Sequence, residues 1–527
     1  METKKHISDT YSLCPICKKK IPAEIYEKDN KIFIEKECNE HGKFNYLYFE
    51  DAKIYEKFKK FSCEGKGIYN PNTINEECPF SCGLCNKHKT HTLLLNIVLT
   101  NRCDFRCYYC FFYANELRGV YEPSLEQIRE MLRIAKKEKP VPPNAVQLTG
   151  GNPEMRDDLI EIIKICKEEG YEHIQLNTQG TYRLWRDENF VKELRNAGLS
   201  TLYLSFDGVS KEKNPKNHYE VPYILENCRK ANLGVVLVPT IINNVNDDEL
   251  GKIINFALNN IDIVRGVNIQ PISFVGKMSA KELEKQRITI PEIIKKIEEQ
   301  TNHKIKAENF YPIPVVSPIT EFVESLTNKP QYLFSTHFAC GAATYIFLDN
   351  NNVVPIPEFL DVENFLKFIK DASDKIRKGN KIFTIANLIL NLRKFIDSKK
   401  QPKDLNFSNL LYNFLIFHNY NTLGEIHKKL LLIGIMHFMD PYNYDVERVN
   451  RCGIHYATPD GRIIPFCTYN VLPEVYRDKI MEKYSIKIEE WEKKNNKKIS
   501  DEIYKRDVKF FENSEIYKKG YNLKNFF

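Results

Sequence analysis

The sequence predicts an α/β protein whose centre is a partial (βα)6 barrel of parallel strands. Short apolar segments alternate with amphipathic helical segments from residue 93 to 280. Strands separated by helices of this length form parallel sheets whose faces the helices cover. Groups of cysteines before and after this region add small metal-binding domains at the N-terminus and a C-terminal domain that carries a helical insertion.

Composition fits a globular protein of several domains. The chain has 527 residues, of which 42% are hydrophobic and 28% are charged. Its net charge of +7 suits phosphate-bearing ligands or anionic membrane surfaces, although ordinary solvated lysines also explain it. No signal-like segment opens the chain, and no apolar run approaches the roughly 18–20 residues of a spanning helix. We therefore expect a cytoplasmic protein without a nucleic-acid partner.

Residues 1–60 predict a ribbon-like domain with one mononuclear metal ion. Segments 24–28 and 31–37 form a hairpin around Asp29 and Asn30. Fifteen cysteines in a chain without a secretion signal favour metal binding over disulfides. A tetrahedral sulfur-rich site accepts either iron or zinc. The predicted ligands are Cys14, Cys17, Cys38 and His41, with another cysteine as the alternative to the histidine.

Residues 61–92 carry a second group of cysteines in a segment rich in glycine and proline. Four cysteines fit a fully ligated 4Fe–4S cluster, and a zinc site is the competing interpretation. His88 and His91 follow closely and could substitute as ligands. The predicted ligands are Cys63, Cys78, Cys82 and Cys85.

The central region, residues 93–280, predicts six strands and the helices between them. The expected strands are 93–100, 145–149, 173–177, 201–206, 235–241 and 264–271, and the expected helices are 123–137, 155–169, 188–197, 219–232 and 247–258. In such folds the functional groups lie at the carboxyl ends of the strands.

The first of these strands leads into Cys103, Cys107 and Cys110. Three thiolates within eight residues indicate a metal or cluster site. A closed structural zinc site needs four protein ligands, whereas a cluster held by three leaves one iron open to a small molecule. The alternative is a zinc loop completed by a distant fourth ligand.

The C-terminal region, residues 281–527, contains Cys340, Cys452 and Cys467 near the predicted strands 345–348 and 462–466. His337 or His455 could complete this set, or one iron could stay open. Cys166 and Cys228 lie on predicted helices of the central region, where they are expected to be buried thiols.

An insertion at about residues 360–440 consists of helical segments with dense apolar side chains, including 365–369, 382–389, 410–416 and 430–433. Periodicity favours a self-contained helical bundle. The alternative is an apolar tunnel or membrane-facing clamp for a long alkyl substrate, since each buried methylene contributes about 0.8 kcal/mol.

The run Cys103-Asp-Phe-Arg-Cys107-Tyr-Tyr-Cys110 resembles the signature of the radical S-adenosylmethionine (SAM) enzymes. The resemblance implies a 4Fe–4S cluster whose open iron chelates SAM, and reductive cleavage of SAM to a 5′-deoxyadenosyl radical. Gly150-Gly151-Asn152-Pro153 resembles the family's GGEP element, with Asn152 where glutamate is common. The resemblance implies a SAM site made by Tyr109, Gly150, Gly151, Asn177, Ser205 and Asp207.

Nearly the whole chain resembles the archaeal tetraether lipid synthases, which join the tails of diether lipids by carbon–carbon bonds. That resemblance implies three 4Fe–4S clusters, one mononuclear iron or zinc, a lipid substrate with an anionic head group, contact with the inner membrane face, and an external ferredoxin- or flavodoxin-type electron donor. One alternative is methylation of a dihydropterin precursor of methanopterin, for which we expect a small, polar pocket. A non-enzymatic zinc protein is the other alternative.

Overall fold

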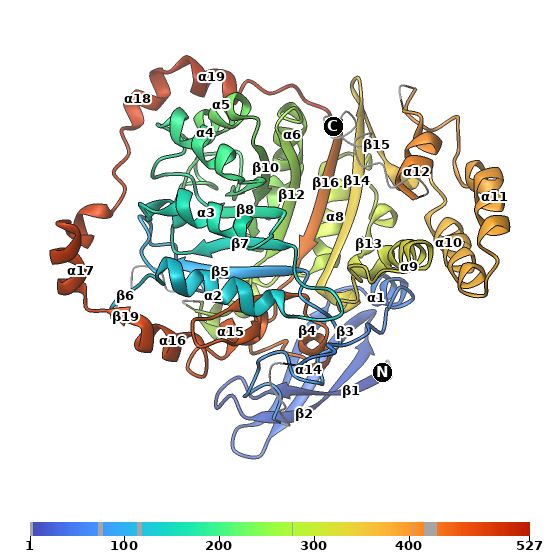
Figure 1. Ribbon diagram of the computed structural model, residues 1–527, viewed down its shortest axis with the longest axis horizontal. Helices are drawn as coiled ribbons and strands as arrows, with labels where there is room; N and C mark the ends of the chain where they lie inside the picture. The colour runs from blue at the N-terminus through green and yellow to red at the C-terminus, as the bar shows by residue number, and fades with distance from the viewer. Residues whose placement is uncertain (1–3, 72–76, 113–117, 277, 404, 416–428) are drawn as a thin grey trace.

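The computed structural model describes residues 4–71, 77–112, 118–276, 278–403, 405–415 and 429–527. A four-stranded antiparallel sheet near the N-terminus lies against a 13-stranded mixed sheet that runs through the rest of the chain (Figure 1). The fold is thus mixed α/β, with a small ribbon at the N-terminus.

Six parallel strands follow one another in chain order across the centre of the large sheet, as the alternating pattern predicted. They are β5 (Leu94–Thr100), β7 (Ala145–Gly150), β8 (His173–Thr178), β9 (Thr201–Ser205), β10 (Gly234–Val238) and β12 (Val264–Pro271). The intervening helices are α2 (Leu125–Lys136), α3 (Leu159–Glu168), α4 (Glu188–Ala197), α5 (Val221–Ala231) and α6 (Leu250–Asn259), and α8 (Ile290–Gln300) follows β12. Cys166 on α3 and Cys228 on α5 are fully buried, as expected.

The two faces of these strands differ in character, because successive side chains of a strand point to opposite faces. One face is apolar and joins the main hydrophobic core beside the helices, through residues such as Leu95, Leu148, Leu204 and Ile269. The other face is polar and includes Asn96, Gln147, Gln175, Tyr203, Asn268 and Gln270. The polar face is where a ligand can be recognised.

Strands from the C-terminal region extend the central sheet at both edges. Beside β12 lies β16 (Leu430–Met436), parallel to it, followed by the antiparallel β14 (Gly341–Asp349) and its partners β13 (Tyr311–Pro312) and β15 (Asn352–Pro355). Beside β5 lies the parallel β17 (Ile454–Ala457), which pairs with β18 (Ile463–Pro465). Residues 281–527 therefore share one sheet with the central region.

The helical expectation for residues 430–433 is wrong, since they belong to β16. This strand lies between β12 and β14 and alternates between fully and partly buried residues. A short apolar run of this kind cannot be told from a buried helix by periodicity alone.

The N-terminal sheet has the order β1 (Lys5–Leu13), β2 (Lys20–Lys28), β3 (Lys31–Cys38) and β4 (Gly42–Phe49), and α1 (Ala52–Lys59) follows it. The hairpin at Asp29 and Asn30 is as expected, with φ of 52° and 57°, the positive values that a two-residue hairpin turn requires. Asp445 fixes this ribbon to the rest of the chain, because it accepts hydrogen bonds from the hydroxyls of Thr10 (2.7 Å) and Tyr48 (2.8 Å).

The helices of the insertion share a second hydrophobic core with α9 (Ser317–Thr327) and β14, which precede the insertion in the chain. Helices α9, α10 (Val362–Arg377), α11 (Lys381–Asn391) and α12 (Phe407–Leu415) pack around residues such as Phe365, Ile369 and Leu388. They lie at one end of the long axis of the molecule (Figure 1). Ile382 and Phe383 on α11 are each 85% exposed, so they line no tunnel. Residue 416 of the expected apolar segment lies outside the described residues.

The last of the C-terminal helices run along the opposite side of the molecule, whereas the first of them lies beside the N-terminal ribbon (Figure 1). They are α14 (Val446–Asn450), α15 (Phe466–Val471), α16 (Arg477–Tyr484), α17 (Ile488–Asn495), α18 (Val508–Asn513) and α19 (Glu515–Gly520). Within the ranges that the structure describes, no helix has both the length and the apolar character needed to cross a membrane.

Glu138 makes the stability of the fold depend on pH. Burial raises the pKa of this carboxyl to about 7, although the Thr92 hydroxyl (2.6 Å) and backbone N–H (2.7 Å) donate hydrogen bonds to it. Because folding raises this pKa, the protonated Glu138 stabilises the folded state. This contribution is fully present below the unfolded pKa of about 4.3 and is lost as the pH rises through 7.

We therefore expect the unfolding free energy of the wild type, relative to Glu138→Gln, to fall by on the order of 3 kcal/mol between about pH 4.5 and pH 8. Denaturant unfolding of both proteins across this range measures the difference. Parallel pH profiles of the two proteins would contradict the assignment.

Candidate functional site

The loop after β5 brings three cysteines to a cavity at the carboxyl ends of the parallel strands. Cys103, Cys107 and Cys110 line this cavity of about 230 Å³. Of the other residues predicted to bind SAM, Tyr109, Gly150, Gly151, Asn177 and Ser205 line the same cavity. Strands that are distant in sequence thus deliver the predicted groups to one place.

Asp104 anchors the cysteine loop to the neighbouring strand ends. Its carboxylate accepts hydrogen bonds from Asn152 Nδ2 (2.9 Å), Gln179 Nε2 (2.7 Å) and Thr181 Oγ1 (2.6 Å). Asn152 is fully buried and does not line the cavity. The asparagine that stands where the family commonly has glutamate therefore joins two loops. Gln179 also donates to the Cys103 sulfur at 3.3 Å.

Gly150 and Gly151 allow the loop after β7 to pass very close to the end of β5. A Cβ on Gly151 would lie 2.0 Å from the Arg102 carbonyl oxygen, and one on Gly150 would lie 2.3 Å from that of Thr100. Gly150 also has a φ of +134°, which side chains other than glycine rarely adopt. Only glycine fits at these two positions.

Lys216 is a cavity residue that the sequence analysis missed. Its ammonium group forms an ion pair with Asp207 at 2.9 Å and donates a hydrogen bond to Ser205 Oγ. Burial opposes its charge, but Asp207 and then Cys107 hold the pKa of Lys216 above its ordinary value. Asp207 itself does not line the cavity. It accepts hydrogen bonds from Tyr109 Oη and from the Thr240 N–H (3.0 Å), so it positions the lysine.

The remaining wall of the cavity is aromatic. Phe466 stacks on Phe438 with ring centroids 4.1 Å apart and on Tyr456 at 5.2 Å, and Phe111 meets Phe466 edge-on at 5.9 Å. All four rings line the cavity. Among the cavity-lining residues that the structure describes, none comes from helices α10–α12 of the insertion. Sequence periodicity could not find this wall, because its four rings lie on or after four separate strands.

The ribbon brings Cys14, Cys17, Cys38 and His41 together, with their ligand atoms all within 4.8 Å of one another. His41 Nδ1 lies 3.6 Å from the sulfurs of Cys14 and Cys38, and the Cys17 and Cys38 sulfurs lie 3.9 Å apart. Tetrahedral bonds of about 2.3 Å from zinc to sulfur separate two sulfurs by about 3.8 Å. The four residues therefore fit one mononuclear metal ion.

The second group of cysteines is brought together only in part. The Cys78 and Cys82 thiols interact directly, and Cys85 lies near enough for its charge to act on Cys82. The Cys63 thiol instead has Ser317 as its hydrogen-bonding neighbour. In the ranges that the structure describes, no contact joins Cys63 to the other three thiols. His88 Nε2 donates to the Cys452 carbonyl oxygen at 2.8 Å and lies 3.0 Å from His455 Nε2, so this histidine is occupied elsewhere.

Cys340, Cys452 and Cys467 converge from distant parts of the chain. Burial raises the pKa of the Cys467 thiol, and the nearby charges of Cys452 and Cys340 add to that effect. The buried Arg448 donates from Nε to the Cys340 sulfur at 3.3 Å, and the Met439 N–H donates to the Cys467 sulfur at 3.4 Å. Such donors stabilise thiolates, as sulfur ligands of a cluster require.

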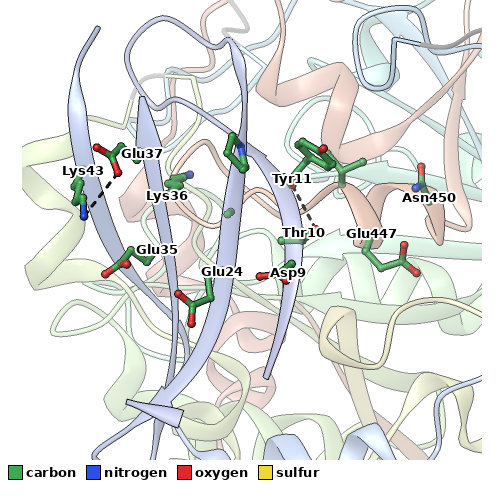
Figure 2. Close-up of a pocket in the computed structure, with 13 residues that line it drawn as sticks. Asp9, Thr10, Tyr11, Glu24, Glu35, Lys36, Glu37, Lys43, Glu447 and Asn450 are labelled. Carbon is green, nitrogen blue, oxygen red and sulfur yellow. Dashed lines mark hydrogen bonds and ion pairs between the residues drawn. The ribbon is translucent and has the colours of Figure 1, made fainter. Parts of the chain in front are cut away.

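A larger concavity of about 610 Å³ lies between the ribbon and α14 (Figure 2). Its lining includes Glu24, Glu35, Glu37 and Glu447, and several of these acids are paired. Lys4 contacts Glu24 and Glu35, and Lys43 contacts Glu37. None of the described residues that line the concavity carries a thiol, so the cysteine-lined cavity is the stronger candidate for an active site.

Comparisons with known proteins agree with this geometry. A family model described as the radical SAM superfamily matches residues 97–257, and one described as the HMPTM N-terminal zinc ribbon domain matches residues 6–50. The chain is 46% identical over 495 residues, 92% of its length and 97% of the relative, to the 7,8-dihydro-6-hydroxymethylpterin dimethyltransferase of Methanocaldococcus jannaschii.

Other similarities cover less of the chain. A probable GTP 3′,8-cyclase of Saccharolobus islandicus is 31% identical over 225 residues, 41% of this chain and 69% of the relative. Among solved structures, SuiB of Streptococcus suis bound to S-adenosylmethionine has a TM-score of 0.34 at 17% identity and covers 41% of this chain and 49% of its own.

Proposed function

The chain belongs to the radical SAM superfamily and, within it, to the family of the M. jannaschii pterin dimethyltransferase, and on this premise we propose that it methylates a dihydropterin. The observation that carries the proposal is the 46% identity over 97% of that relative. The cavity supports it, since a compact space with amide side chains and an aromatic wall suits a flat, hydrogen-bonding heterocycle.

The expectation of lipid-tail coupling is wrong. The full-length similarity is to a pterin methyltransferase, and the matching N-terminal zinc ribbon model carries the same family's description. The apolar insertion had suggested a lipid substrate. Its helices pack around a hydrophobic core instead, and the apolar side chains that stay outside this core, such as Ile382 and Phe383 on α11, are exposed. The apolar composition of about residues 360–440 therefore reflects packed helices rather than a tunnel for a lipid.

SAM and a 4Fe–4S cluster belong to this superfamily, and the residues present fit both. We propose that Cys103, Cys107 and Cys110 hold the cluster, and that Gly150, Gly151, Asn177, Ser205 and Tyr109 surround SAM. When bound together, the cluster and SAM supply reductive cleavage of a carbon–sulfur bond. Lys216 faces the same cavity with its positive charge fixed by Asp207, which suits it to the carboxylate of SAM.

The residues of the chain perform positioning rather than proton transfer. Asp104 holds the cysteine loop against β7 and β8, and Asp207 holds Lys216 and Tyr109. The stacked aromatic rings exclude water from their side of the cavity. Radical chemistry needs this exclusion and close approach of the reacting carbons.

We further propose that the six central strands form the partial barrel expected from the sequence, and that the metal in the ribbon is zinc. Auxiliary clusters at Cys78, Cys82 and Cys85 and at Cys340, Cys452 and Cys467 are proposed as electron relays or as partners of the substrate. A ferredoxin- or flavodoxin-type protein is proposed as the external electron donor.

Mass spectrometry of the reaction products tests the proposed function. The protein is reconstituted anaerobically with iron and sulfide, reduced, and incubated with SAM and 7,8-dihydro-6-hydroxymethylpterin. We expect pterin products heavier by one and two methyl groups, and 5′-deoxyadenosine. Parallel incubation with archaeal diether lipid is expected to give no coupled product. Unchanged pterin in the presence of full cluster content and SAM cleavage would refute the proposal.

A further inference from the structure

Gln270 differs from every other amide side chain that lines the cavity. The lining amides are Gln147, Asn177, Gln179, Asn268 and Gln270. Four of them already have protein partners. In the described part of the chain, no hydrogen bond reaches the Gln270 side chain. Gln270 is partly exposed where it lines the cavity, so the donor and the acceptor of its amide are both available to a ligand.

Among the other lining amides, Gln147 has its partners fixed by a series of hydrogen bonds across the sheet. Asn96 Nδ2 donates to the His455 carbonyl oxygen at 3.4 Å, which can only accept. Asn96 Oδ1 therefore faces Gln147 Nε2 (2.6 Å), and Gln147 Oε1 accepts from Gln175 Nε2 (2.6 Å). Because this series of hydrogen bonds begins at a backbone carbonyl oxygen, the amide groups of Asn96, Gln147 and Gln175 each have one defined orientation.

The other lining amides are engaged in similar ways. Gln179 donates to Asp104 at 2.7 Å, and Asn177 donates to Thr149 Oγ1 at 3.4 Å. The Asn268 side chain lies against the Tyr203 hydroxyl. Gln270 is two residues beyond Asn268 on β12, so both point to the same face, and Gln270 lies nearer the carboxyl end where the cavity opens.

Phe438 lines the same cavity as Gln270, since it follows β16, the strand that pairs with β12, and it offers an aromatic face. The Ser273 hydroxyl donates to the Phe438 carbonyl oxygen at 2.8 Å, which ties the segment after β12 to the segment after β16. Phe438 stands at one end of the aromatic stack, with Phe466 next to it and Tyr456 beyond, and it is partly exposed to the cavity. A flat heterocycle can continue this stack.

We propose that Gln270 and Phe438 determine substrate specificity: the Gln270 amide pairs with the lactam edge of the pterin while Phe438 stacks on the ring. This inference rests on the proposed pterin methylation. A primary amide presents an acceptor beside a donor, and the lactam N–H and C=O of a pterin present the complementary pair. Neither residue is assigned a part in cleaving SAM.

Binding measurements on the reconstituted holoprotein with SAM test the pair. Gln270→Met keeps the length of the side chain but removes its hydrogen bonds. We expect it to weaken the binding of 7,8-dihydro-6-hydroxymethylpterin about tenfold, while iron content and SAM affinity stay at wild-type values. Phe438→Leu is expected to weaken pterin binding about three- to tenfold, and Phe438→Tyr to restore it.

Gln331→Met is the matched control, because Gln331 lies in a loop and does not line the cavity. This variant should bind pterin like the wild type. The inference is overturned if Gln270→Met binds pterin as tightly as the wild type, or if it weakens SAM and pterin equally. A failure of the proposed function would appear in the wild type itself, as absence of pterin binding and methylation. A failure of the inference alone would appear only in the variants.

Discussion

Replacing Cys107 by alanine is expected to reduce the formation of 5′-deoxyadenosine from SAM to the background level, the largest effect of any single substitution in the chain. Cys103, Cys107 and Cys110 are the only three cysteines lining the cavity among the described residues. A cluster held by only three cysteines already leaves one iron without a protein ligand. Loss of a second protein ligand is expected to release the cluster from the protein. Anaerobic reconstitution followed by chromatographic measurement of 5′-deoxyadenosine and iron content gives the result.

Cys228→Ala is the matched control for this experiment. Cys228 is buried on α5 in the hydrophobic core and contacts no other cysteine among the described residues. We expect it to keep wild-type SAM cleavage, with at most the modest loss of stability that a small cavity brings. If Cys107→Ala cleaved SAM at the wild-type rate with full iron content, the cavity would not be the radical SAM site.

Cys14→Ala is expected to remove one metal ion per chain and to unfold the ribbon, residues 5–49. Zinc bound in small domains supplies about 10–16 kcal/mol of apparent binding energy, which in such domains is folding energy. The sheet around the site is small, and its cluster of buried residues next to the metal consists of Cys14, Ile21 and Cys38. Elemental analysis for zinc and iron, with hydrogen exchange of the ribbon amides, measures both effects.

Cys166→Ala, in the core on α3, is the control for the ribbon experiment and should keep the metal and the exchange protection. Because Asp445 ties the ribbon to the segment before α14 through Thr10 and Tyr48, we also expect faster exchange around residue 445 in Cys14→Ala. Retention of the full metal content in Cys14→Ala would show that the four residues do not form the metal site.

Local patterns in the sequence predicted much of the fold and of the site. The apolar run before Cys103 and the spacing of the three cysteines identified the superfamily, and the boundaries of β12 agree with those expected. Gly150 and Gly151 were recognised by their resemblance to the GGEP element, and the structure shows a close backbone approach that requires glycine there. The four ribbon residues were identified from their spacing around one hairpin. Each of these features is encoded within one short segment of the chain, the longest of which runs from Cys14 to His41.

The choice of substrate could not be predicted in this way. Apolar residues at helical spacing in residues 360–440 fit both a bundle and a lipid tunnel, and only their packing on one another excludes the tunnel. The pterin alternative was recognised, but the residues that favour it are scattered. Phe438 follows β16, Tyr456 lies on β17 and Phe466 follows β18, and no local pattern joins these strands.

The sequence by itself predicted the chemistry that starts the reaction, because the three proposed cluster ligands lie within one loop. Only the tertiary structure decided which residues surround that loop. Strands β16 and β17 join the two edges of the central sheet through pairings of residues far apart in the chain, such as Gly266 with Leu432 and Leu94 with Ile454. Such pairings depend on the packing of the whole sheet, so Lys216, Gln270 and Phe438 share a cavity that no local pattern could reveal.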